Sequence, residues 1–202
     1  MARWTPVVLA AALAAGPACG PTTSPASGDA QAACRASPTA TTLPASASAD
    51  DSHVSLRYPV PVCELPLPAA QVEAVWNEHA APAWRVSGDD DLASPDGQVS
   101  ISMARGPAGG VSVVTVNVKS VLDGGVAWRT EAPALGDLVQ ALAATVADDE
   151  AFGRHVRASF DAAAAATTPY HELSEEGGRT VLVAANRDQV VLAVTGPQPP
   201  AP

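Results

Sequence analysis

The side chains that could carry out chemistry are scattered along this sequence rather than gathered in a motif. The four histidines, His53, His79, His155 and His171, lie far apart, and none has another His or Cys at the spacing typical of a metal site. The motifs GxSxG, HExxH, GxxxxGK[ST] and GxGxxG, which mark nucleophiles, zinc proteases and phosphate or dinucleotide sites, do not occur. The sequence therefore predicts no catalytic, cofactor-binding or metal-ligating residue.

Two groups of acidic residues come closest to a site. Glu172, Glu175 and Glu176 could supply paired carboxylates for acid–base catalysis. They stand beside the glycine pair 177–178, which is typical of a turn. We therefore expect a solvated acidic loop at this position.

The second group, residues 89–91 with Asp96 and Gly97, has the side chains that calcium loops use. An EF-type loop needs oxygen ligands at positions 1, 3 and 5, glycine at 6 and glutamate at 12. With Gly97 at position 6, Leu92 falls at position 1 and Met103 at position 12, so the pattern fails at both ends. We predict a solvated hairpin loop, with loose calcium binding as the alternative.

Aromatic side chains could instead bind a sugar or a peptide by stacking. Since aromatic residues make up only 4% of the chain, at least two of Trp76, Trp84 and Trp128 are expected in the core. Trp84 and Trp128, each followed by Arg, are predicted to be the more exposed pair. His79 falls on the same helical face as Trp76 and is predicted to be a core or boundary residue.

The N-terminus has the layout of a secretory signal peptide. Arg3 supplies a positive charge, residues 7–15 form the apolar run VVLAAALAA, and small residues lead to Cys19. The apolar run is much shorter than the roughly 20 residues that a membrane-spanning helix needs. We predict a signal peptide over residues 1–18.

The stretch Gly16-Pro17-Ala18-Cys19 resembles the lipobox of bacterial lipoproteins. In that family the signal is cut before the Cys, which receives a diacylglycerol thioether and fatty acyl chains such as palmitate. Gly16 stands where the family prefers Leu, and the resemblance covers only the first 19 residues.

The resemblance implies that Cys19 is the lipidation site and that the protein is anchored in the cell envelope. The anchor would be the outer membrane or the outer leaflet of the cytoplasmic membrane, according to the type of bacterium. A soluble secreted protein, cut after Ala18 or further on, is the alternative.

The other two cysteines form a possible pair. If Cys19 is acylated, Cys34 and Cys63 remain as an even number in an oxidising compartment. A disulfide between them would close a loop of about 28 residues and stabilise the fold by roughly 3–4 kcal/mol in the chain-entropy model. Two free thiols are the alternative.

Composition divides the chain into three parts after the signal peptide. Residues 19–52 consist almost entirely of Ala, Ser, Thr, Pro, Gly and Asp, which predicts a flexible, lipid-anchored linker. Residues 53–195 are predicted to form one folded domain. Residues 196–202 are predicted to be a disordered Pro-rich tail.

Hydrophobic periodicity predicts the elements of the domain. Helices are expected at 69–80, 134–147 and 150–165, the last one capped by Asp148 or Asp149. Extended or strand segments are expected at 54–62, 83–87, 98–105, 111–122, 126–130, 179–185 and 189–195. The hairpin turns favour an α+β domain, an antiparallel sheet with about three helices mainly on one face.

Charge narrows the choice of partners. With 21 acidic and 11 basic residues the net charge is −10, which argues against nucleic acid and against a basic membrane-binding patch. The export signal, the tether and the absence of a catalytic motif together predict a non-catalytic binding module. It would contact an envelope protein or glycan through a sheet face or an edge strand, with the lipid as its link to the membrane. A secreted or anchored hydrolase whose residues converge only in three dimensions is the alternative, and a purely structural envelope protein is a third.

Overall fold

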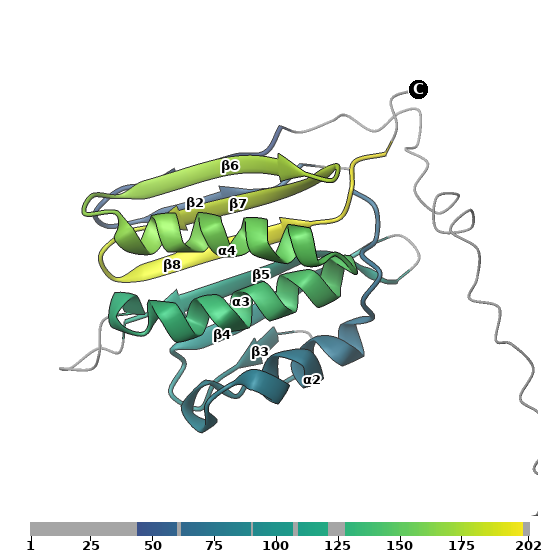
Figure 1. The fold of residues 1–202 in the computed structure, drawn as a ribbon, viewed down its shortest axis with the longest axis horizontal. Coiled ribbons are helices and arrows are strands. Elements are labelled where there is room, and N and C mark those ends of the chain that lie inside the picture. Colours follow the sequence, from purple (N-terminus) through teal and green to yellow (C-terminus); the bar gives the residue numbers. More distant parts are fainter. Residues whose placement is uncertain (1–43, 60–61, 90, 107–108, 121–127, 200–202) are drawn as a thin grey trace, which may run out of the picture.

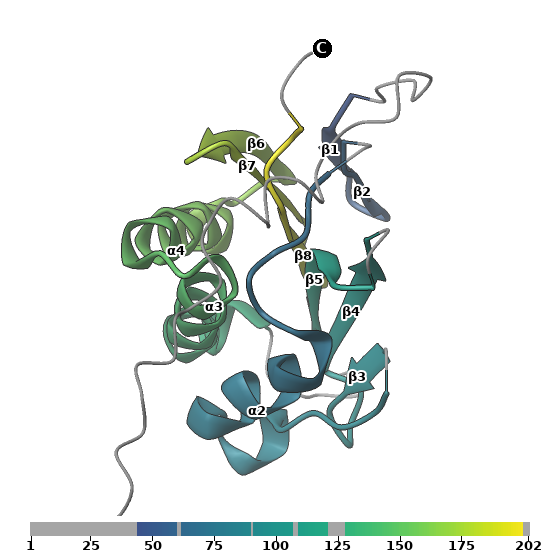
Figure 2. The same ribbon diagram turned by 90° about the vertical axis from the view of Figure 1, so that its right-hand side faces the viewer.

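A six-stranded antiparallel sheet organises the chain. The computed structural model describes residues 44–59, 62–89, 91–106, 109–120 and 128–199. The strand order is β3-β4-β5-β8-β7-β6, and every neighbouring pair is antiparallel. Three helices cover one face of this sheet, and a two-stranded hairpin lies against the other (Figures 1 and 2). The predicted α+β class, with an antiparallel sheet and its helices on one face, is confirmed.

Strand β4 alternates between buried apolar and more exposed polar positions, whereas the central strands β5, β7 and β8 are mainly buried on both faces. Val99 and Ile101 of β4 are fully buried towards the helices, whereas Ser100 and Ser102 point to the other face. The main sheet consists of β3 (Asp91–Ala93), β4 (Val99–Arg105), β5 (Val111–Lys119), β6 (Tyr170–Glu176), β7 (Arg179–Ala185) and β8 (Gln189–Thr195).

The α-helices of the described residues are α2 (Ala69–His79), α3 (Ala132–Ala147) and α4 (Glu150–Ala165). The predicted cap is confirmed at Asp149, whose carboxylate accepts the backbone N–H groups of Ala151 and Phe152. Gly153 lets α4 approach α3 closely, because a Cβ there would lie 2.7 Å from the Cβ of Ala144. The two helices therefore form a tight layer over the sheet.

Small residues allow a hairpin to pack on the opposite face. The strands β1 (Ser46–Ala49) and β2 (Val54–Arg57) pair with each other and lie across β6, β7 and β8. They cover an apolar patch formed by Val113, Leu182 and Ala193. The linker composition had predicted no structure here. Ordered structure therefore starts before residue 53, because alternate Ala side chains suffice to cover this small patch.

The chain passes from the hairpin to the helix face over one end of the sheet. The backbone N–H of Cys63 donates to the carbonyl of Pro197, and that of Leu65 donates to the carbonyl of Val111. Gly196 is required at this crossing, since a Cβ there would lie 1.8 Å from the Cys63 carbonyl oxygen. Residues 196–199, predicted to be disordered tail, are thus held in part by the crossing segment.

Two predicted strands are wrong. In the stretch 83–87 the chain forms a 3₁₀ turn (Pro82–Trp84) and then a single bridge between Ser87 and Ala93, because Pro82 favours a helical start. In the stretch 126–130 the described residues Trp128–Thr130 form a second 3₁₀ turn, and residues 121–127 lie outside the described part.

The interior is filled by side chains. An apolar hollow between α3, β5 and β8 measures only about 10 Å³, about the smallest volume that can hold one water molecule. None of the helices in the described ranges combines the length and the apolar character that crossing a bilayer requires.

Candidate functional site

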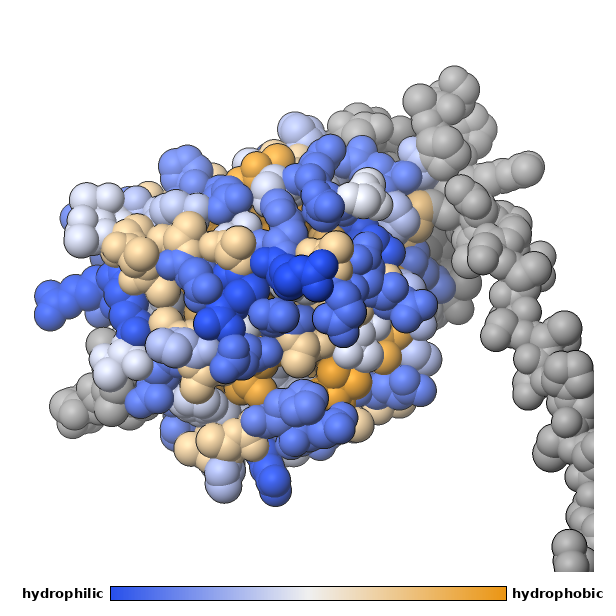
Figure 3. All heavy atoms as spheres, viewed as in Figure 1, coloured by the Kyte–Doolittle hydropathy of each residue, from blue (hydrophilic) through white to orange (hydrophobic). Residues whose placement is uncertain are grey.

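An open groove between α2 and α3 combines polar and apolar walls; another mixed hollow, of about 400 Å³, lies beside Glu73, Asp89 and Arg105. Two adjoining hollows of 340 Å³ each share His79, Asp137 and Ala141 as lining residues. In the space-filling view, apolar atoms are visible between these two helices on a mainly polar face (Figure 3). The size lies in the range typical of small-ligand sites.

The groove has two chemically different ends. One end is lined by the polar side chains of Gln140, Thr145 and Glu150, and the other by Trp84 and Leu138. An elongated ligand could therefore place a polar group at one end and an apolar group at the other.

Hydrogen bonds hold the α2 wall of the groove in place. The Asn77 amide donates to the Val86 carbonyl and accepts from the Val86 N–H, each at 2.8 Å. The indole of Trp76 donates to the carbonyl of Trp84 at 2.8 Å, and the Trp84 indole donates to Gln98 at 3.1 Å. These contacts fix the segment after α2 beside the helix and so define the shape of the groove.

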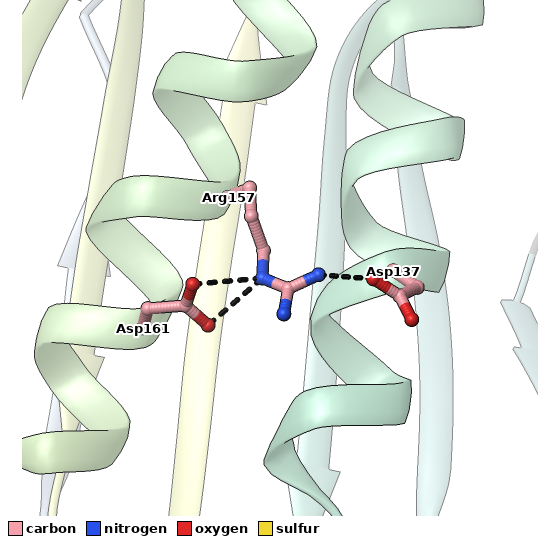
Figure 4. Close-up of polar contacts among 3 residues, drawn as sticks. All are labelled: Asp137, Arg157 and Asp161. Carbon is pink, nitrogen blue, oxygen red and sulfur yellow. Dashed lines mark hydrogen bonds and ion pairs between the residues drawn. The ribbon is translucent and has the colours of Figure 1, made fainter.

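An ion-pair network between α3 and α4 borders the side of the groove that α3 forms. Arg157 of α4 reaches Asp137 of α3 and, one turn along its own helix, Asp161 (Figure 4). Burial alone would lower the pKa of Arg157, but hydrogen bonds and attraction from the two carboxylates outweigh it and raise the pKa. Asp137 stays 78% exposed at the rim, so part of its field remains open to a ligand.

A second polar cluster lies between α4 and the edge strand β6. His155 Nε2 is 2.9 Å from the Ser174 hydroxyl, and Ser159 and Tyr170 both donate to the carboxylate of Glu172. Burial, followed by the hydrogen bond and the charge of Glu172, raises the pKa of Tyr170 to about 12. A serine beside a histidine is the arrangement from which nucleophilic catalysis starts.

The cluster lacks the remaining parts of a catalytic triad within the described residues. The carboxylate of Glu172 bonds to Tyr170 and Ser159, and no described carboxylate orients the ring of His155. The observed bonds make the cluster a polar contact between α4 and β6.

The acidic residues near the glycine pair are not a loop. Glu172, Glu175 and Glu176 lie in β6, and the glycines at 177–178 form the two-residue turn into β7. The prediction of an acidic loop is wrong because polar side chains occupy both faces of this strand, so its sequence lacks the apolar–polar alternation that predicts a strand. Only its contacts with α4 and β7 reveal it as a strand.

The aspartate-rich loop uses its carboxylate for its own turn. Asp96 accepts the backbone N–H of Gln98 and the hydroxyl of Ser94, and both bonds lower its pKa. Asp90 lies outside the described residues. Within the described ranges no three His, Cys, Asp or Glu side chains are grouped so that they could hold a metal ion.

The aromatic and histidine predictions are partly wrong. Trp76, Trp84 and Trp128 are all buried, so the expected exposure of the last two is not found. Trp128 packs edge-on against Phe160 with its ring centroid 6.0 Å away. His79 is exposed rather than in the core, because the last turn of α2 borders the groove.

Other predicted positions lie apart from the groove. His53 stands in the β1–β2 turn, where its N–H donates to Asp50, and His171 is exposed on β6. Cys63 is buried in the crossing segment. Cys19 and Cys34 lie outside the described residues, so the lipidation site and the disulfide stay predictions.

The groove was missed in the sequence because it is formed by two helices distant along the chain. The one available signal was His79, a polar residue on an otherwise apolar helical face. Comparisons with known proteins add no functional information: no family model, no curated protein and no solved structure matches the chain.

Proposed function

We propose that this chain is an exported protein, anchored in the cell envelope through a lipid on Cys19, whose folded domain is a non-catalytic binding module. The support for the anchor is the N-terminal layout that ends in Cys19. The observation that carries the binding role is the groove between α2 and α3. It joins polar and apolar walls in a volume that suits a small ligand.

The charges of the groove favour a cation. Asp137 and Glu150 are carboxylates on its lining, and His79 is the only basic side chain among its lining residues. Arg157, the nearby cation, is already paired with Asp137 and Asp161. The carboxylates of Asp137, Asp161 and Glu150 outnumber this one guanidinium, so the charge at the groove stays negative and would attract a positive group.

The apolar end of the groove indicates what kind of group the positive centre of the ligand should carry. Leu138 and Trp84, together with small alanines, offer a surface that would bury a short hydrocarbon chain. The ligand class we propose is an ammonium group that carries a short apolar chain, either free or as part of an envelope component.

A pair of probes of opposite charge tests this class. Calorimetric titration of the full chain with hexyltrimethylammonium should give saturable binding, and hexanoate should bind at least about tenfold more weakly, a difference of about 1.4 kcal/mol. Ala141→Phe fills the groove and should abolish binding. Ala74→Phe, on the exposed face of α2, is the matched control and should leave it unchanged.

Two results would overturn the groove as the ligand site. One is equal binding of both probes. The other is unchanged binding of the cation by Ala141→Phe.

The alternative of a hydrolase rests on one contact, the 2.9 Å separation between His155 and Ser174. An activated serine would be labelled by a fluorophosphonate probe, and Ser174→Ala would remove the label. We expect no labelling of the wild-type chain. Labelling that Ser174→Ala or His155→Ala abolishes would replace the binding proposal with an enzymatic one.

A further inference from the structure

The outer edge of β6 is a seven-residue strand margin with which no other described strand pairs, although β1 packs against β6 without pairing with it. β6 lies at the end of the sheet order, and its one strand partner among the described residues is β7. Its central residue, Leu173, is 45% exposed and is one of two large hydrophobic side chains exposed in the described part of the chain. An edge of this kind is a template for pairing with another strand.

The turn into β7 determines which backbone groups face outwards. Gly177 and Gly178 have φ values of 59° and 75°, the positive values of a two-residue type I′ hairpin turn. The flanking residues Glu176 and Arg179 then form a hydrogen-bonded pair, and hydrogen-bonded pairs alternate along the ladder. The free N–H and C=O groups of β6 therefore belong to His171, Leu173 and Glu175.

We infer that a second copy of this chain pairs with β6 along this edge, antiparallel and with Leu173 opposite Leu173. In this register His171 faces Glu175 of the other copy on both sides of the centre. The three residues with free backbone groups then bond to one another in a self-complementary way. The two main sheets join into one continuous sheet across a two-fold axis.

Charge selects this register over its neighbours. A shift that places His171 opposite Leu173 also places Glu172 opposite Glu172. A shift the other way places Glu172 opposite Glu176. With Leu173 at the centre no glutamate directly faces another, and Glu172 faces Ser174 instead. Like charges directly opposite each other destabilise a strand pair, so the centred register is the favourable one.

The neighbouring helix leaves room for the partner. Ala151, Ala158 and Ala162 of α4 are exposed and lie three to seven positions from His155, which contacts β6, so small side chains occupy the helix surface beside this edge. The Glu172 carboxylate is already bonded to Ser159 and Tyr170, so it does not extend beyond the edge without partners.

This inference does not depend on the lipid anchor or on the groove. The groove lies between α2 and α3, and α4 separates it from β6 (Figure 1). A dimer through β6 would leave both grooves open, so ligand binding and self-association can be measured independently.

Cysteine cross-linking of the full chain tests the register. Leu173→Cys should form a reductant-sensitive dimer under mild oxidation, because hydrogen-bonded antiparallel partners have Cα atoms about 5.5 Å apart, within disulfide range. His171→Cys is the matched control, since its two copies would be on the order of 13 Å apart along the strands. The double variant His171→Cys/Glu175→Cys should cross-link again. The wild-type chain, which has three cysteines of its own, gives the background level of cross-linking.

Sedimentation velocity provides a second measurement that does not depend on oxidation. The wild-type chain should show a concentration-dependent dimer, and Leu173→Lys should remain monomeric with an unchanged circular dichroism spectrum. The inference is overturned if Leu173→Cys cross-links no faster than His171→Cys. It is equally overturned if Leu173→Lys sediments like the wild type.

Discussion

The close contact between α3 and α4 gives a quantitative prediction, because two helical glycines differ in what a methyl group would meet. In Gly153→Ala the new Cβ would lie 2.7 Å from the Cβ of Ala144 and 2.9 Å from the carbonyl oxygen of Gln140. These atoms belong to a packed helix and can yield only if α3 and α4 separate. Overpacking of this kind costs about 1–3 kcal/mol, and the helical preference of Ala over Gly returns about 1 kcal/mol. We expect a net destabilisation of about 1 kcal/mol.

Gly136→Ala is the matched control. Its new Cβ would lie 2.5 Å from the Nε of Arg157, the end of a flexible side chain that can swing into solvent. The lost ion pairs to Asp137 and Asp161 are worth about 0–1 kcal/mol each at such exposed positions, which the gain of about 1 kcal/mol in helical preference offsets. We expect a change near zero.

Urea unfolding followed by circular dichroism compares the two variants with the wild-type chain. Gly153→Ala should lower the free energy of unfolding by about 1 kcal/mol more than Gly136→Ala does. If Gly153→Ala is as stable as Gly136→Ala, or more stable, the close approach of the two helices is not as described.

Two further predictions concern partly buried polar side chains. In a Tyr58→Phe variant, ultraviolet absorbance should show Tyr170 titrating at about pH 12. The contribution of its protonated hydroxyl to stability is therefore complete below about pH 10 and is lost as the pH rises through about 12. Titration of Tyr170 near pH 10 would contradict its hydrogen bond to Glu172. Asn77→Ala should destabilise the chain by about 1–2 kcal/mol in urea, because both backbone groups of Val86 lose their partner, and an unchanged midpoint would refute that role.

Much of the fold followed from local patterns. The helices α3 and α4 were predictable because their apolar residues recur at the helical period and face one core. The hairpin of β7 and β8 was predictable because two Val- and Leu-rich runs flank the turn at residues 186–188. Asp149 followed from capping chemistry for the same reason, since a cap depends on residues two and three positions along. Local rules succeed where the stabilising contacts are local or all face the same way.

The failures have non-local causes. The strand β6 is acidic on both faces and exists because β7 and α4 supply its partners. The strand β1 is built from Ser and Ala, which alone would not predict a strand, and it forms against β2 and the patch around Leu182. The exposure of His79 depends on where α3 lies, which no local pattern specifies.

The central claim is an envelope-anchored binding domain, and intact mass spectrometry of the chain isolated from its own cell envelope tests it most directly. We predict a mature chain that begins at Cys19 and carries added acyl mass. Its other two thiols, Cys34 and Cys63, should react with an alkylating reagent only after reduction. A chain that retains Met1, or one without lipid, would contradict the anchor, and thiols that alkylate without reduction would contradict the disulfide.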